Sequence, residues 1–492
     1  MALDNYPMTK HFFDVTWSAL GGDPRWEAQI EIEGEGILES SFYTSDFGCG
    51  VYAALAAAVS EVVSLTGTPA PFVRMDRARS SAQSMCQAQT IGGWRLPKAV
   101  GGESLWDWYP TGDGRWLEVH VPYPYQAKRL LIAIGADWSK ESVAGIIRQA
   151  AADELEEAIL RAGGTVAASR TMEEWAVHEH GKMVLAEPFV DVVETTPWED
   201  DGWRPTPGRP LAGLHVLDCT RVVAGPEASR FLAGLGAEVL RIDPPVWEET
   251  GGAYVAEDLL AGKRCARLDL KTTEGHDTFL RLLSEADVFL HGYRQDVLDG
   301  LGLGEEVRDF TRPGLVEASE DAYGWTGPWQ GRRGFDCLVL TSSGLSVAEG
   351  EWAGLDHPRG MGTVILDHTV GYAMATAVLR GLTRRLTTGM GSRSRAALAR
   401  SAAELAKAGR NFEPVEPYLP GRGARGYIPE FATESRVSST PNGPARRTVP
   451  PFEIDDTPLF WDRCGELLGS AAPRWASVHG GAHGFEWWSE RV

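Results

Sequence analysis

The chain has 492 residues, 43% of them hydrophobic and 23% charged, which is an ordinary globular composition with room for two or three domains. Its formal net charge of −21 argues against nucleic acid and anionic membranes as general partners, because both attract basic surfaces. The six cysteines are scattered without CxxC pairs or zinc-like spacing, so we expect reduced thiols, no metal site and a cytoplasmic location.

The N-terminal residues 1–83 are predicted to be mainly helical. Their first residues lack the basic and apolar regions of a signal peptide. Residues 48–66, "GCGVYAALAAAVSEVVSLT", are apolar nearly all round and are followed by Gly and Pro, which predicts a buried helix. No uninterrupted apolar run of about 18 residues occurs, so we expect no membrane-spanning segment.

Residues 84–185 are predicted to form a small α/β domain. "RWLEVHV" at 115–121 has the composition of a strand, and "SVAGIIRQAAADELEEAILRAGG" at 142–164 has the period of one amphipathic helix that a Gly pair ends. Residues 186–205 combine prolines, tryptophans and an acidic run, which favours a linker or a strap across a surface.

The pattern changes in residues 206–405. Apolar, β-branched runs such as "LHVLDCTRVV", "AEVLRID" and "DVFLHGY" alternate with helical stretches such as "GPEASRFLAGLG". This alternation predicts βαβ units on a parallel sheet whose strands are buried on both faces. Residues 406–492 are rich in Pro, Gly and Arg, and we expect a partly disordered extended coil whose tryptophans anchor it to the body.

One segment occurs twice. When Asp46 is aligned with Asp367 without a gap, residues 46–83 match residues 367–404 at the Asp-x-x-x-Gly start, at several alanines, and at an "ARS" tripeptide. Two Ala-rich helices could match by coincidence, but the Asp-x-x-x-Gly start and "ARS" lie outside the Ala-rich part. The match therefore indicates an internal repeat.

Six motifs in the second half carry a resemblance to the family III CoA-transferases, which include formyl-CoA transferase, carnitine CoA-transferase and the related α-methylacyl-CoA racemase. They are "PLAGLHVLDCTRVVAGPEASRFLAGLGAEVLRID", "LAGKRCARLDLKTTEG", "LLSEADVFLHGYRQDVLDGLGLG", "YGWTGPW", "RRGFDCLVLTSSGL" and "GTVILDHTVGYAMATAVLRGL". Residues 101–121 and 170–192 resemble the back half of the same family, so the chain resembles a circularly permuted copy or a trimmed tandem copy.

The resemblance implies an α/β fold with a Rossmann-like CoA-binding domain at 206–405, a smaller α/β domain at 84–185, and an N-terminal segment that completes the large domain. It also implies an interlocked dimer, as a homodimer or as a heteromer with a homologous chain. A dinucleotide-binding dehydrogenase is disfavoured, because "RVVAGPEASRFLAG" lacks the G-x-G-x-x-G pattern after the first strand.

The activity that the resemblance implies is transfer of coenzyme A from an acyl-CoA thioester to a carboxylic acid, with no tightly bound cofactor. The nucleophile would be Asp367, in the family's Asp-x-x-x-Gly pattern, with Asp46 as the alternative. A carboxylate near a helix N-terminus is favoured as an anion, and Gly371 would let a thioester approach. From the residues alone, Asp367 could equally be a helix N-cap, and the two roles are compatible.

The resemblance also carries coenzyme A contacts onto four short segments. Lys271, Arg294 and Arg333 would meet its phosphates or adenine, and Tyr293 would flank the adenine, although surface charge and core packing are the ordinary roles of these residue types. The full set is Val222, Val223, Ala224, Leu268, Asp269, Leu270, Lys271, Gly292, Tyr293, Arg294, Arg333, Gly334, Phe335 and Asp336.

Several departures from the family pattern leave alternatives open. Pro244 and Gly300 stand where some members have arginines, and the Gly-rich loop is reduced to Gly101-Gly102-Glu103. These changes would also suit a non-catalytic, CoA-binding partner subunit. A racemase needs a second base, and Phe335 stands where racemases have a histidine, which disfavours racemisation.

Overall fold

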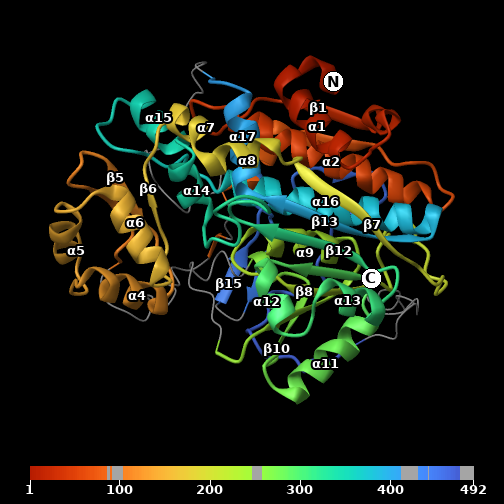
Figure 1. The fold of residues 1–492 in the computed structure, drawn as a ribbon. Coiled ribbons are helices and arrows are strands. Elements are labelled where there is room, and N and C mark those ends of the chain that lie inside the picture. Colours follow the sequence, from red (N-terminus) through yellow and green to blue (C-terminus); the bar gives the residue numbers. More distant parts are fainter. Residues whose placement is uncertain (86–88, 91–103, 247–257, 412–429, 441–442, 477–492) are drawn as a thin grey trace.

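The computed structural model describes residues 1–85, 89–90, 104–246, 258–411, 430–440 and 443–476, and it has the mixed α/β fold with a large, mainly parallel sheet that the sequence predicts (Figure 1). Six parallel strands alternate with helices from residue 215 onward, as the βαβ pattern requires. These strands are β8 (His215–Cys219), β9 (Glu238–Asp243), β10 (Lys263–Arg267), β11 (Val288–His291), β12 (Val316–Asp321) and β13 (Met390–Ala397).

The order of strands in this sheet is β10-β9-β8-β11-β12-β13-β7. Its direction along the chain reverses between β8 and β11, and α/β sheets bind ligands beside the carboxyl ends of strands at such a point. The edge strand β7 (Val190–Pro197) is antiparallel to β13 and lies inside the segment predicted as a linker. This strand lies in a Pro-rich acidic stretch without a sustained apolar alternation, so only its pairing with β13 reveals it.

Helices cover both faces of the sheet. One face packs against α9 (Ala224–Gly234) and α16 (Ile365–Thr388), and the other packs against α11 (Thr273–Ser284) and α12 (Gln295–Gly300). Successive residues of the strands alternate between the two cores: Val216 lies with α9 and α16, and Leu217 lies with α11. Helix α13 (Glu305–Thr311) precedes β12.

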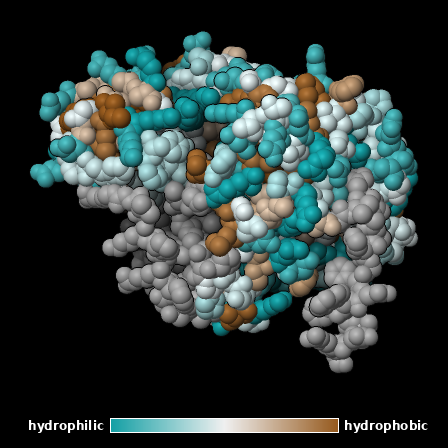
Figure 2. All heavy atoms as spheres, turned by 90° about the horizontal axis from the view of Figure 1, so that it is seen from below, coloured by the Kyte–Doolittle hydropathy of each residue, from teal (hydrophilic) through white to brown (hydrophobic). Residues whose placement is uncertain are grey.

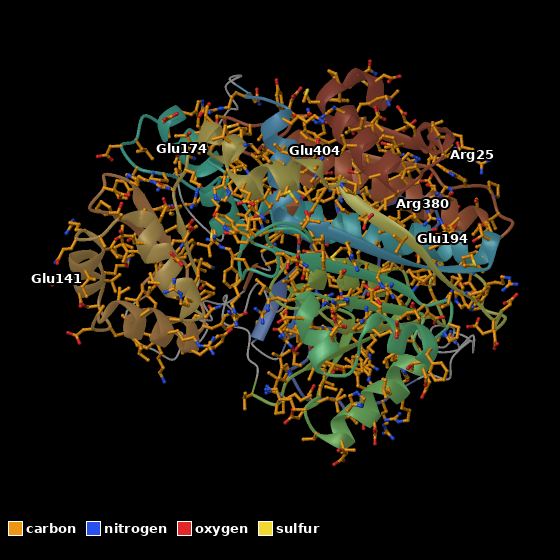
Figure 3. The ribbon with its side chains drawn as sticks, viewed as in Figure 1. Arg25, Glu141, Glu174, Glu194, Arg380 and Glu404 are labelled. Carbon is orange, nitrogen blue, oxygen red and sulfur yellow. The ribbon has the colours of Figure 1, made fainter. Side chains whose placement is uncertain are left out.

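The N-terminal unit, residues 1–83, covers the outer side of α16. It contains η1 (Leu3–Asn5), α1 (Pro7–Ala19), η2 (Pro24–Gln29), β1 (Ile30–Glu33), α2 (Thr44–Ser64), β2 (Val73–Asp76) and α3 (Arg77–Gln83). Arg380 of α16 reaches toward this unit and pairs with Glu61 of α2 (Figure 3). Helix α2 is long and apolar enough to cross a membrane, but 94% of its most apolar window is buried inside the protein, as in a core helix.

The repeated segment also repeats in structure. With Asp46 aligned to Asp367, α2, β2 and α3 fall on α16, on the end of β13 and on α17 (Leu398–Lys407). The strand β2 pairs with β1 in a separate small sheet, whereas β13 pairs with β12 in the large sheet. The match is therefore a repeated helix–strand–helix element and not a coincidence of composition.

The small unit, residues 104–168, forms a separate lobe at the left of Figure 1, to one side of the large sheet. It contains β4 (Asp107–Pro110), β5 (Trp116–Val119), α4 (Pro124–Ile134), α5 (Lys140–Ile147), α6 (Ala152–Arg161) and β6 (Val166–Ala168). The single helix predicted at 142–164 is wrong, because it is split into α5 and α6. The turn after β4 stabilises the connection between α5 and α6: the Gly112 N–H donates to the Ala150 carbonyl, and the Asp113 carboxylate accepts from the Ala152 N–H.

Four helices connect the small unit to the large sheet, and the C-terminal region then wraps the body. The helices are α7 (Met172–Val177), α8 (Glu179–Ala186), α14 (Asp336–Ser342) and α15 (Leu345–Trp352). The C-terminal elements are η3 (Glu430–Ala432), β14 (Ser438–Thr440), β15 (Gly443–Arg446) and β16 (Glu453–Ile454), with β15 beside β3 (Gln89–Thr90) and β16 beside β2.

Two tryptophans anchor this C-terminal region, as the sequence predicts. The Trp461 ring is buried and its indole N–H donates to the Arg230 carbonyl at 2.8 Å, and the Trp475 ring stacks on His215 at 4.2 Å. The described part of the region thus forms short strands and anchored turns.

On the face of the molecule shown in Figure 2, apolar residues are scattered among hydrophilic ones.

Candidate functional site

A cavity of about 260 Å³ lies where the strand order reverses. The chain segments that follow β8, β11 and β12 form one side of it, and the small unit closes the opposite side through Tyr123, Tyr125, Gln126 and Thr165. The remaining walls come from the segment before α14 and from the first residues of α16 and α17. Residues that are far apart in the sequence therefore meet at one ligand-sized space.

Asp367 lines this cavity from the first turn of α16 and is only 8% exposed. It is not the N-cap, so the cap role considered for it is wrong: Val364 occupies that position without a side-chain bond. Asp336 satisfies the helix end instead, because its carboxylate accepts from the N–H groups of Leu366 at 2.8 Å and Asp367 at 3.2 Å. The Asp367 side chain is thereby left to face the cavity.

The surroundings of Asp367 disfavour its charged form. Burial, followed by the charges of Asp336 and Glu320, raises its pKa well above the ordinary value. Within the described part of the chain, no group donates a hydrogen bond to its carboxylate. Once ionised, such a carboxylate is poorly solvated and poorly neutralised, which is the condition of an activated nucleophile.

Asp46, the alternative nucleophile, is differently placed. Its carboxylate accepts from the Thr9 hydroxyl at 2.6 Å and from Arg77 at 2.7 Å, and it is absent from the cavity lining. The repeat places Leu398 where the first copy has Arg77, and Leu398 lines the cavity. The first copy thus neutralises its aspartate with an arginine, and the second copy has leucine at that position.

Most residues predicted to contact coenzyme A come together here. Those that line the cavity are Val222, Val223, Ala224, Gly292, Tyr293, Arg294, Arg333, Gly334 and Phe335. Asp336 lies behind the lining, where it binds the start of α16. Leu268, Asp269, Leu270 and Lys271 follow β10, two strands away from the switch point, and do not line the cavity; Lys271 is exposed.

The turn after β8 has unusual backbone geometry. Val222 has a φ of 69°, which is strongly disfavoured for a β-branched residue. Strained residues persist where the surrounding structure imposes them, and they concentrate at ligand sites. The strained backbone of Val222 is therefore consistent with a ligand-binding role for residues 222–224.

Sequence reasoning missed two cations of the cavity. Arg221 lies 5.5 Å from the centre of the Tyr293 ring, and Arg332 pairs with Glu156 of the small unit at 2.7 Å. With Arg294 and Arg333 they bring four arginines to the lining. Arg221 lies near the end of the predicted first strand, "LHVLDCTRVV", so its position close to a carboxyl end was a usable signal.

Glu320 is a further lining residue that sequence reasoning missed. Its carboxylate accepts from the Gly225 N–H at 3.0 Å, in the first turn of α9. The first turn of a helix is a common place for a phosphate, but here the chain supplies its own carboxylate to the Gly225 N–H. The position of Glu320 in β12, at a carboxyl end beside the switch point, was the available signal.

Gly371 was predicted to let a thioester approach Asp367, but its contacts in the structure are with helix α9. A Cβ on this residue would collide with the carbonyl oxygen of Ala224. The glycine therefore permits close contact between α16 and α9, which brings Asp367 next to the turn after β8.

The shortened Gly101-Gly102-Glu103 loop lies outside the described residues. Among the described residues, no group of three His, Cys, Asp or Glu side chains is placed to hold a metal ion.

Residues 211–414 match the family model described as CoA-transferase family III. "Acetyl-coenzyme A transferase nodX" of Hypoxylon pulicicidum is 33% identical over 305 residues, which cover 57% of this chain and 51% of the relative. "Succinate–glutarate CoA-transferase" of Agrobacterium fabrum is 31% identical over 198 residues, which cover 37% of this chain and 49% of the relative. The chain thus spans about half the length of the curated relatives it matches.

One relative also has a solved structure. "Probable fatty acyl-CoA transferase Rv3272" of Mycobacterium tuberculosis is 34% identical over 199 residues, which cover 37% of this chain and 49% of the relative. Its crystal structure in an orthorhombic form is 31% identical with a TM-score of 0.38, and the match covers 41% of this chain and 58% of that one.

Proposed function

Because this chain belongs to CoA-transferase family III through residues 211–414, we propose that it transfers coenzyme A from an acyl-CoA thioester to a carboxylic acid, with Asp367 as the nucleophile. One observation carries the proposal: a buried carboxylate with no neutralising partner in the described chain faces a cavity at the strand switch point, and four arginines line that same cavity.

The proposed reaction uses covalent catalysis. An Asp367 carboxylate oxygen attacks the thioester carbonyl carbon, the C–S bond breaks, and coenzyme A leaves as a thiolate, which gives a mixed anhydride. The thiolate then attacks the carboxyl carbon of Asp367 and releases the donor acid, which leaves an Asp367 thioester. The acceptor carboxylate then attacks the Asp367 thioester and releases the coenzyme A thiolate, which gives a second mixed anhydride. The thiolate attacks the acceptor's carbonyl carbon in this anhydride, which forms the new acyl-CoA and restores the Asp367 carboxylate.

The positions of the arginines support one orientation of a bound acyl-CoA in the cavity. Arg221, Arg294 and Arg333 suit the phosphates of coenzyme A, because guanidinium groups bind phosphate oxygens through charge-assisted hydrogen bonds. Tyr293 lies beside Arg221 and offers a ring for the adenine. The thioester end would then extend past the turn at 222–224 to Asp367.

The contrast between the two repeat copies supports Asp367 over Asp46. A nucleophile must be ionised but not engaged, and the Asp46 carboxylate is engaged by Arg77 at 2.7 Å. The matching position in the second copy is Leu398, which cannot form an ion pair. The N-terminal copy therefore serves structure in this proposal, and the second copy serves catalysis.

Isotope exchange tests the proposal without knowledge of the natural acceptor. Labelled butyrate should exchange into butyryl-CoA, because both half-reactions use one acid and its own thioester. Asp367→Asn should lower the exchange rate by at least about a thousandfold, since it removes the nucleophile. Hydroxylamine should convert the wild-type intermediate to a hydroxamate on the peptide that carries Asp367, detected by mass spectrometry.

Asp46→Asn is the matched control. It should retain exchange, with a loss of stability from the broken pair with Arg77 that circular dichroism would record. Exchange that depends on Asp46 and not on Asp367 would contradict the assignment. A folded protein that exchanges label with no acyl-CoA but co-purifies with a homologous chain would support the alternative of a CoA-binding partner subunit.

A further inference from the structure

Glu320 faces the same cavity as Asp367, at the point where the strand order reverses. One carboxylate oxygen accepts from the Gly225 N–H at 3.0 Å, and the other lies 2.9 Å from where a Cβ on Gly292 would be. Glu320 is therefore held between the turns that follow β8 and β11. This places it where the reacting end of a bound thioester would lie in the proposed function.

The charged groups around this end of the cavity are acidic. Asp336 and Glu320 are the charges that act on Asp367, and Glu118 is the one that acts on Asp336. Burial, and then the charges of Asp218 and Asp321, raises the pKa of Glu320 to about 8, against the opposing effect of the Gly225 N–H. The site already disfavours negative charge.

Two of the four arginines of the cavity lie beside carboxylates of the chain, and the other two lie together. Arg332 pairs with Glu156 at 2.7 Å, and Arg221 lies 3.6 Å from Asp243. Burial, and then Arg294, lowers the pKa of Arg333, which places these two cations together and suits them to phosphates. None of the four is among the charged groups that act on Asp367.

A second carboxylate on the acyl group would therefore be a buried anion without a partner. Leaving a charge buried and unpaired is strongly unfavourable, whereas burying a methyl group is favourable. An uncharged acyl chain instead meets Phe335, Val223, Ala224 and Leu398, which line the same cavity. The lining of the cavity thus favours uncharged acyl groups over acyl groups that carry a second carboxylate.

We propose that this chain accepts uncharged acyl groups and rejects those of dicarboxylic acids, and that Glu320 determines this specificity. The inference rests on the proposed function, because it concerns the acyl group that is carried to Asp367. It names a substrate class by its charge and leaves the chain length open.

The experiment compares two acids that match in length and differ in charge. Label exchange is measured at pH 8.5, above the raised pKa of Glu320, for butyrate with butyryl-CoA and for succinate with succinyl-CoA. The wild type should show a kcat/KM at least about tenfold higher for the butyryl pair. Glu320→Gln should reduce that ratio at least about tenfold, because it removes one negative charge. Glu306→Gln, the same change at an exposed position on α13, should leave the ratio unchanged.

Each outcome bears on a different claim. A wild type that exchanges succinate as efficiently as butyrate would overturn the inference and leave the proposed function standing. A preference for butyrate that Glu320→Gln does not alter would overturn the role of Glu320. A wild type that exchanges neither acid, nor any other acid tried, would overturn the proposed function and this inference with it.

Discussion

At the scale of residues, the end of the cavity at Asp367 is surrounded by carboxyl groups without a cation to neutralise them in the described chain. Asp336 holds the two N–H groups at the start of α16, and burial is the main reason that its pKa is raised to about 7. Asp367 lies beside it with a pKa raised well above the ordinary value. Such clusters are unfavourable for folding and are retained where chemistry needs them.

This arrangement predicts a shifted pH dependence. In the proposed reaction the carboxylate is the attacking form of Asp367, so exchange should rise as pH rises through its raised pKa. Asp336→Asn removes a negative neighbour and lowers the pKa of Asp367, so the acid limb of the pH–rate profile should move to lower pH. Asn still accepts from the N–H groups of 366 and 367, which preserves the helix end. Asp277→Asn, at an exposed position on α11 outside the cavity lining, is the control. An acid limb that stays in place would show that Asp336 does not act on the nucleophile.

At the scale of elements, the site depends on the close contact of α9 with α16. Gly371 permits this contact, since any Cβ would meet the Ala224 carbonyl oxygen. Both helices begin at the cavity, α9 after β8 and α16 with Asp367 in its first turn. In the proposed function, their separation therefore sets the distance between a thioester held at the turn after β8 and Asp367.

Gly371→Ala should push the two helices apart. We expect a loss of about 1–3 kcal/mol in the free energy of unfolding, typical of an overpacked core, together with a fall in kcat. Urea unfolding and label exchange would measure both. Gly145→Ala is the matched control, because a Cβ there meets nothing within 4 Å and alanine favours the helix. Unchanged activity in Gly371→Ala would show that the helix spacing is not critical.

At the scale of the whole molecule, the C-terminal region connects units that are distant in sequence. The strand β16 extends the small sheet of the N-terminal unit, and Trp461 packs on α9 of the large domain. Arg230 lies over the Trp461 ring at 4.5 Å and pairs with Asp258 at 2.9 Å. The C-terminal region thus stabilises the helix that begins at the cavity.

Trp461→Ala should destabilise the entire protein. Removing a buried tryptophan costs about 3–5 kcal/mol, and the midpoint of urea unfolding should fall accordingly. Leu467→Ala, in the same region but 61% exposed, should have little effect. If the two variants unfold at the same urea concentration, the C-terminal region is not a structural support.

The parallel-sheet pattern, the repeat and the choice of Asp367 as a candidate nucleophile could be predicted from the sequence, because they depend on local composition and on a contiguous motif. It also predicted that tryptophans of residues 406–492 anchor this region, and Trp461 and Trp475 do so. Prediction from sequence ended where a feature depends on contacts between distant residues: the pairing of β7 with β13, the division of α5 from α6, and the placement of 268–271 outside the cavity.

Only the tertiary structure separated Asp367 from Asp46. Both begin an Asp-x-x-x-Gly motif in an apolar helix, and their local sequences do not distinguish them. The difference lies in what folding brings to each carboxylate: Arg77 to Asp46, and Asp336 and Glu320 to Asp367. The charge state of a buried carboxyl is set by burial and by neighbouring charges, and these neighbours come from other elements of the fold.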